Sequence, residues 1–195
     1  ALLPLAERDH VIIGSVCDAE FVGHPSWAFD WGPAYPDGFA LLLDWCIADW
    51  QKKGKPGMPK IGVIHWDNPF GREWQLGGLE YAQQKGVTVY DVGHPPSAVD
   101  FSPYIIAMME KEVDYLFLWQ VEPSISSAGV QVHEMGVDKK VEKVIYSWWG
   151  PTRTGGLRYH PDELEGHMAV AQFLKGADLD ANEMCVNVWT KYGGR

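Results

Sequence analysis

Lys60–Gly71, with the sequence KIGVIHWDNPFG, opens the stretch of chain that decides the fold. Ile61–His65 is a short apolar run that predicts a buried strand, and the chain then turns at Asn68-Pro69. Apolar residues recur at helical spacing between three further runs of this kind, which cover 87–91, 115–119 and 143–147. Near-continuous apolar strands that alternate with amphipathic helices predict an α/β fold, in which a parallel sheet is covered by helices on both faces.

Large side chains stand where these predicted strands end. Trp66 and Phe70 follow the first strand, Trp119 ends the third, and Trp148 follows the fourth. In an open parallel sheet, ligands bind beyond the carboxyl ends of the strands. Aromatic rings there can stack on a flat ligand or hold a cation over their faces, although the same rings can also fill the core. We therefore take these four residues as candidate ligand contacts.

Glu122 follows the third predicted strand and is a fifth candidate. It could direct a carboxylate toward a ligand. A glutamate before a proline at a helix start is, however, more often a partner of the helix dipole. Both interpretations stay open at this stage.

Composition and charge exclude several classes of function. The 195 residues are 46% hydrophobic and 22% charged, as in a globular protein, and the formal net charge of −10 argues against nucleic acid as a partner. Apolar runs stay short of the roughly 18 residues that span a membrane. The three cysteines are far apart and lack the spacing of a zinc site. Phosphate-binding and dinucleotide-binding glycine motifs are also missing, so we predict no metal, no cofactor and no catalytic constellation.

A strong helix is predicted before the first strand of the sheet. Asp37 is the expected N-cap and Gly54 the expected end. The apolar stripe of this helix comprises Phe39, Leu42, Leu43, Cys46, Ile47 and Trp50. Lys55–Pro59 follows, with two prolines and a glycine, and predicts a domain boundary or a hinge crossing.

The ends of the chain give weaker patterns. Short strands are expected at 11–13 and 27–31. After the sheet, we expect a long polar loop at 151–165, a strand at 166–173 and an amphipathic helix at 180–192.

Three segments together resemble a known family. Lys60–Arg72, the motif Val99-Asp-Phe-Ser and the strand Val113-Asp-Tyr-Leu-Phe-Leu are similar to the second lobe of type 1 periplasmic binding proteins. The branch they resemble most is the leucine/isoleucine/valine-binding type that serves ABC transporters. The resemblance continues upstream over 4–18 and downstream into 166–168. It implies a two-lobe α/β fold with Rossmann-like parallel sheets and a ligand cleft between the lobes.

The resemblance also implies a division of the chain. Residues 1–57 would be part of a first lobe, 58–172 a complete second lobe, and 173–195 a crossing back toward the first. The first lobe would be incomplete, so we expect the chain to be a fragment of a longer binding protein.

Family positions carry over to three residues near the start of the chain. The first-lobe loop of the family grips a ligand carboxylate, and Ser15, Cys17 and Asp18 match its positions. Asp18 stands where a threonine is common, and its carboxylate would repel that of a ligand. After the fourth strand, Trp148-Trp149 replaces the acidic residue that often holds an ammonium group. The resemblance therefore points to an aromatic, amide or cationic ligand more than to an aliphatic amino acid.

The function implied is that of an extracytoplasmic solute-binding protein of an ABC importer. It would bind a small amino-acid-like, aromatic or amide ligand without chemistry, in the periplasm or outside the cell, with the transporter permease as partner and an upstream lipid anchor as one option. One alternative is a sensory domain of the same fold that feeds a signalling module. A second is a doubly wound enzyme of the flavodoxin or dehydrogenase type.

Overall fold

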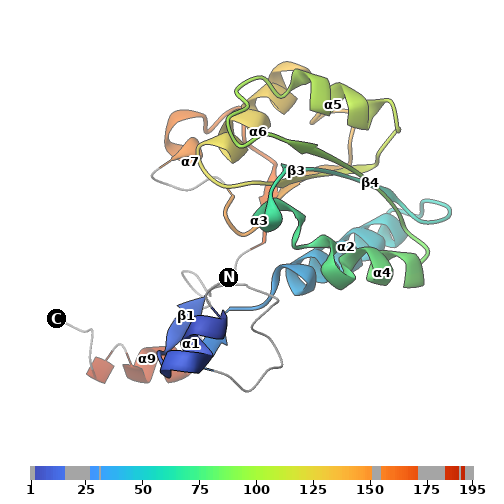
Figure 1. Cartoon of the computed structure of the whole chain (residues 1–195). Helices are drawn as coiled ribbons and strands as arrows, with labels where there is room; N and C mark the ends of the chain where they lie inside the picture. Colours follow the sequence, from blue (N-terminus) through green and yellow to red (C-terminus); the bar gives the residue numbers. More distant parts are fainter. Residues whose placement is uncertain are drawn as a thin grey trace.

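A computed structural model describes residues 3–15, 27–30, 32–150, 155–170, 183–188 and 190–191. Among these residues, the strands form a five-stranded sheet in the order β4-β3-β5-β6-β7 and a separate two-stranded sheet, β1-β2. All neighbouring strands are parallel. The parallel α/β fold expected from the sequence is confirmed (Figure 1).

The strands of the large sheet follow the apolar runs. They are β3 Lys60–Trp66, β4 Thr88–His94, β5 Tyr115–Trp119, β6 Lys143–Tyr146 and β7 Met168–Ala169. β5 is central, and each of its five residues is buried. Its sequence YLFLW has no polar face because helices cover both sides of the sheet.

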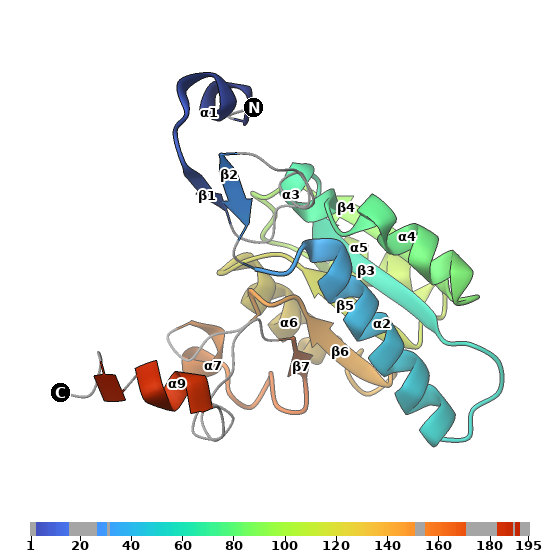
Figure 2. The same ribbon diagram turned by 90° about the horizontal axis from the view of Figure 1, so that it is seen from below.

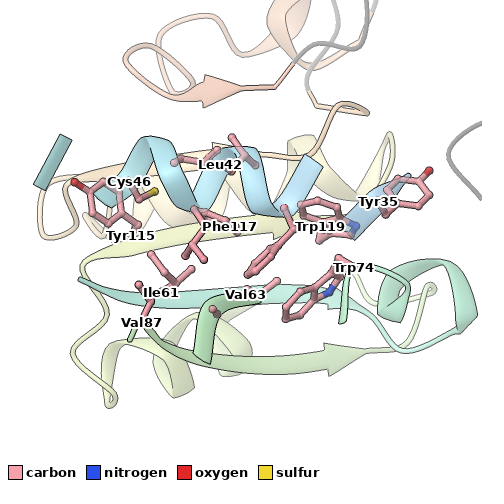
Figure 3. Packing of buried hydrophobic residues seen from close by; sticks show 14 of the residues in the cluster. Tyr35, Leu42, Cys46, Ile61, Val63, Trp74, Val87, Tyr115, Phe117 and Trp119 are labelled. Carbon is pink, nitrogen blue, oxygen red and sulfur yellow. The ribbon is translucent and has the colours of Figure 1, made fainter. Parts of the chain in front are cut away.

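Helices cover the sheet in two layers, which Figure 1 shows on opposite faces. On one face lie α2 Tyr35–Lys52 and α4 Gln75–Gln84, and on the other lie α5 Ser102–Met109 and α6 Ser124–Glu134. The alternation of side chains along β5 divides the core between the layers. Tyr115, Phe117 and Trp119 pack with α2 (Figure 3), whereas Leu116 and Leu118 pack with α5 and α6.

The packing of α2 places the segment at 55–59 within one packed unit. α2 lies within the range 1–57 that we expected in the first lobe, but its apolar stripe packs against the five-stranded sheet. Lys55–Pro59 is therefore the loop between α2 and β3, two elements of one packed unit. Trp50 holds this loop, because its Nε1 donates to the carbonyl of Pro56 at 3.1 Å. Prolines and glycines are as common in such a loop as in a hinge. Because α2 packs against the five-stranded sheet, we propose that the lobe boundary lies before Tyr35.

The start of α2 also differs from expectation. The N-cap is Ala34, and Asp37 lies in the first turn, where its carboxylate still favours the positive end of the helix dipole. The helix ends as predicted, since Gly54 adopts a φ of +69°.

The start of α5 is stabilised by Asp100, which lies one residue before the N-cap of this helix. The carboxylate of Asp100 accepts a hydrogen bond from the main-chain N–H of Ser102 at 2.9 Å.

The N-terminal elements form a small unit of their own. α1 Leu3–Asp9 is followed by β1 Ile13–Ser15, which pairs with β2 Ala28–Asp30. Figures 1 and 2 show this pair outside the five-stranded sheet, beyond the first turn of α2. The two short strands expected in this region are confirmed, with bounds shifted by one or two residues.

The segment after β6 is partly different from prediction. A short helix, α7 Gly156–Tyr159, interrupts the region expected to be a polar loop. Of the next strand, expected at 166–173, only β7 is present among the described residues: 166, 167 and 170 lie outside it, and 171–173 are not described. The expected C-terminal helix is present as α9 Glu183–Val188. None of the described helices is both long and apolar enough to cross a membrane.

Candidate functional site

The carboxyl ends of β3, β5 and β6 lie at one edge of the five-stranded sheet, since these strands are parallel neighbours. Trp66 is the last residue of β3, and Trp119 is the last residue of β5. Trp148 follows β6, and Phe70 lies in α3 Pro69–Arg72, directly after β3. These four predicted residues define what we call the aromatic edge. The fold brings them together.

Tyr35 connects the members of the aromatic edge, and sequence reasoning missed it. The centre of its ring lies 5.2 Å from that of Phe70, 5.3 Å from that of Trp148 and 6.0 Å from that of Trp119. Tyr35 begins α2, whose first turn lies at the same end of the sheet as α3 (Figure 2). A helix that precedes a parallel strand starts at the carboxyl edge of the sheet, and this rule could have identified Tyr35.

A tight turn positions Trp66 and Phe70. The side chain of Asn68 accepts a hydrogen bond from the main-chain N–H of Gly71 at 2.8 Å and so caps α3. Gly71 approaches the main chain closely, because a Cβ added there would lie 2.0 Å from the carbonyl oxygen of Trp66. The rings of Trp66 and Phe70 meet edge to face at 5.7 Å. Only glycine permits this turn, and the turn sets both rings.

The members of the aromatic edge differ in how deeply they are buried. Trp66, Phe70 and Trp148 are half-buried. Trp66 also donates from its Nε1 to Ser124 Oγ at 3.3 Å, which ties β3 to the start of α6. Trp119 is completely buried and packs against Trp74, with ring centres 6.3 Å apart (Figure 3). Among the four, these three half-buried rings are therefore the ones open to solvent.

The side chain of Glu122 is held within the protein. Its Oε2 accepts from Ser126 Oγ at 2.6 Å, and its Oε1 accepts from the main-chain N–H of Gly156 at 3.1 Å. The carboxylate thus joins the first turn of α6 to the first residue of α7. Of the two interpretations that the sequence left open, these contacts favour the structural one.

The three first-lobe candidates stand at the limit of what the structure describes. Ser15 ends β1, where its main chain pairs with Asp30. Cys17 and Asp18 lie outside the described residues. Their roles stay predictions from the family resemblance.

His65 is buried next to the aromatic edge but is fully engaged in hydrogen bonds. Its Nδ1 lies 2.8 Å from the carbonyl oxygen of Trp66, and its Nε2 lies 3.1 Å from Asp91 Oδ2. The hydrogen bond with His65 lowers the pKa of Asp91. His65 therefore joins β3 to β4 and has no ring nitrogen left for a ligand. Among the described residues, no group of His, Cys, Asp or Glu could hold a metal ion.

Two polar residues, Gln120 and Ser147, lie beside the aromatic edge. Gln120 follows Trp119, and its main-chain carbonyl accepts a hydrogen bond from Ser147 Oγ at 3.2 Å. Both residues are completely buried. Sequence reasoning did not single out Gln120, because a lone glutamine between apolar residues gives no recognisable motif.

A comparison with family models finds one match, described as "Periplasmic binding protein", over residues 1–195. No curated protein matches the chain in a comparison of sequences.

Several solved structures share its fold. A leucine-binding protein from Thermotoga maritima has a TM-score of 0.75 at 14% identity, over 99% of this chain and 53% of its own. A branched-chain amino acid ABC transporter protein from Thermus thermophilus with bound valine has a TM-score of 0.71 at 16% identity, over 85% of this chain and 42% of its own.

A third structure is a solute-binding protein of an ABC transporter from Rhodopseudomonas palustris in complex with p-hydroxybenzoic acid. Its TM-score is 0.61 at 14% identity, over 75% of this chain and 39% of its own. At these identities the likeness concerns the fold alone. The chain spans about half, or less, of the length of each of the three.

Proposed function

The chain belongs to the periplasmic binding protein family, and from this premise we propose that it is the ligand-binding receptor of an ABC importer. The receptor binds one small molecule between two lobes and presents it to the permease subunits outside the cytoplasm. No covalent step is involved. The binding energy comes from contacts that form when the lobes close on the ligand.

The aromatic edge is the observation that supports this proposal best. Trp66, Phe70 and Trp148 are half-buried at the carboxyl ends of parallel strands, where α/β sheets bind their ligands. The ring of Tyr35 contacts those of Phe70 and Trp148, and Phe70 in turn contacts Trp66. Aromatic walls with a few polar groups are typical of small-molecule sites.

The first lobe supplies the other half of the proposed site. Ser15, Cys17 and Asp18 are the residues that would face the aromatic edge when the lobes close. With a lobe boundary before Tyr35, α2 belongs to the second lobe, and helices of that lobe cover both faces of its sheet. The segment before it and the segment after 172 then belong to the first lobe or to its crossings.

An aromatic or amide ligand fits the edge better than an aliphatic amino acid. The solved structures of this fold include one with bound valine and one with p-hydroxybenzoic acid. In this chain the strand ends carry large flat rings, and Glu122 is engaged by Ser126 and Gly156. Rings of this kind favour a flat ligand through stacking.

Isothermal titration with a panel of compounds tests the proposed function. The panel contains valine, leucine, phenylalanine, benzoate, 4-hydroxybenzoate, benzamide and benzylamine, with chromatographic analysis of each compound after incubation. We expect saturable one-to-one binding of at least one aromatic compound, which is recovered unchanged. Turnover of a bound compound, or no binding across the panel, would contradict the proposal.

A pair of tryptophan variants locates the site. Trp148→Ala should weaken binding of the best compound at least roughly five-fold, since a stacked ring contributes about 1 kcal/mol or more. Trp45→Ala is the matched control, because Trp45 lies half-exposed in α2 and is not part of the aromatic edge. Equal losses in the two variants would place the ligand elsewhere.

A further inference from the structure

Gln120 carries hydrogen-bonding groups that the protein leaves unused. Its side chain is 0% exposed, and in the described part of the chain neither its Nε2 nor its Oε1 has a hydrogen-bond partner. An amide that is buried without partners destabilises the folded protein, so natural proteins rarely keep one without a function. Gln120 lies at the aromatic edge, because Trp119 precedes it and Ser147 of the neighbouring strand end bonds its carbonyl.

Three indole N–H groups at the same end of the sheet also have no acceptor among the described residues. Trp119, which precedes Gln120, and Trp148, which follows Ser147, each bury an Nε1 without an acceptor. Trp74 packs against Trp119 and buries a third. In Figure 3 the nitrogens of Trp74 and Trp119 lie on the side of their rings nearer to Tyr35, at the end of the sheet that carries the aromatic edge. Buried donors without acceptors therefore accumulate in this part of the molecule.

The two carboxylates of the same region already have contacts within the protein. Both oxygens of Glu122 accept hydrogen bonds from the protein. Asp67, which follows Trp66, forms an ion pair with Arg72. In the described part of this edge, the oxygens of both carboxylates are therefore oriented toward groups of the protein, and a ligand ammonium would have to compete with these contacts.

We infer that the aromatic edge selects a flat ligand that carries a carboxylate or carboxamide and no cationic group, and that Gln120 determines this specificity. The inference rests on the proposed function. Indole and amide N–H groups donate to the oxygens of the ligand, and the amide oxygen of Gln120 accepts an N–H or O–H where the ligand has one. Neutral donors hold a carboxylate through charge-assisted hydrogen bonds, whereas they offer a cation nothing.

Three compounds with the same ring test whether the site prefers a carboxylate, a carboxamide or an ammonium group. Benzoate, benzamide and benzylamine differ only in the group attached to the ring, and isothermal titration at constant ionic strength compares them. We expect benzoate or benzamide to bind at least roughly ten-fold more tightly than benzylamine, because a hydrogen-bonded site rejects analogues that leave its polar groups unpaired. Benzylamine binding as tightly as the other two, or more tightly, would overturn the inference.

Gln120→Leu tests the residue itself. The variant should bind benzoate and benzamide roughly ten-fold more weakly, because it removes the amide donor and acceptor. Without ligand, its thermal midpoint should stay equal or rise, since no hydrogen bond within the protein is lost. A structural glutamine would behave in the opposite way, with a lower midpoint and unchanged affinity, and that result would overturn the inference.

Two further variants complete the experiment. Gln84→Leu, on the exposed side of α4, is the control and should change neither affinity nor midpoint. Trp148→Phe keeps an aromatic ring and removes one unused donor, so it should weaken benzoate more than benzylamine. If none of the wider panel binds the unmodified protein, the proposed function fails and this inference fails with it. If the panel binds without preference for the acceptor groups, only the inference fails.

Discussion

The phenolic oxygen of Tyr35 accepts a hydrogen bond from the indole Nε1 of Trp149 at 2.6 Å, across 114 positions of sequence. This bond joins the first turn of α2 to the loop that follows β6. Tyr35 also touches Phe70, Trp119 and Trp148, so one side chain fixes the geometry of the aromatic edge.

Tyr35→Phe should destabilise the protein by about 1 kcal/mol, because it leaves the Trp149 donor without this acceptor while the ring contacts remain. Urea unfolding followed by circular dichroism measures the change. Trp149→Phe and the double variant complete a cycle, in which the coupling should be positive and of similar size. A coupling near zero would show that the bond does not contribute in solution.

The large sheet was predictable because its signal is local. The residues of β5 are apolar without interruption, and only a strand covered on both faces allows that. The same reasoning placed Trp66, Trp119 and Trp148 at one edge, since parallel strands end together. The family resemblance, drawn from three motifs, is confirmed by the match over the whole chain.

What the sequence could not reveal depends on contacts between distant segments. Tyr35 begins α2, and the direction of that helix could place it at this end of the sheet, but its partners come from three separate elements that no local pattern connects. Gln120 is distinctive only because its side-chain amide lacks partners among the described residues, which no sequence pattern records. The composition of Lys55–Pro59 predicts a boundary and a simple loop equally well, because prolines and glycines do not indicate what lies on either side of them.

Gly71→Ala should damage both the stability of the protein and its binding site. The added Cβ would overlap the carbonyl oxygen of Trp66, so the turn between β3 and α3 must move. We expect a loss of about 3 kcal/mol in the free energy of unfolding, as for other forced backbone shifts. The tryptophan fluorescence should also change, because Trp66 and Phe70 depend on this turn.

Gly14→Ala is the control for this effect, since nothing lies within 4 Å of the Cβ that it would add. Its stability should differ from that of the unmodified protein by less than about 0.5 kcal/mol. Similar losses in both variants would mean that the close approach at Gly71 is not the cause.

Glu142 binds two lysines at the end of the sheet opposite the aromatic edge. Lys53 Nζ lies 2.9 Å from its Oε2, and Lys55 pairs with its Oε1. These hydrogen bonds, that of Lys55 first, lower the pKa of Glu142. Glu142→Gln should reduce stability by about 1 kcal/mol at neutral pH, and the loss should shrink in high salt.

Glu112→Gln is the matched control, because Glu112 is 84% exposed and lies 3.4 Å from Lys60. It should have almost no effect on stability, as is usual for exposed ion pairs. Urea unfolding of both variants at low and high ionic strength measures the difference. If Glu142→Gln loses the same stability at low and at high ionic strength, the loss comes from changed packing and not from the missing charge.

His167 should make stability depend on pH. Burial lowers its pKa from 6.5 to about 4, and the hydroxyl of Tyr146 lies 2.6 Å from its Nδ1. The folded protein therefore favours the neutral ring, whose Nδ1 accepts from Tyr146, whereas the unfolded chain takes up a proton more readily. Since the folded pKa is the lower one, the stabilising contribution is complete above pH 6.5 and is lost as the pH falls toward 4.

His167→Gln isolates this contribution, because the amide oxygen can still accept from Tyr146 but does not titrate. Between about pH 7.5 and 4.5, the unmodified protein should lose about 2 kcal/mol more than the variant, a value that allows for the partial exposure of the ring. Urea unfolding at both pH values measures the two losses. The carboxylates whose pKa values are lowered titrate in both proteins, so they cancel in the comparison. Parallel stability curves for the two proteins would show that His167 is protonated as easily in the folded state as in the unfolded chain, and that its burial does not act on the ring as proposed.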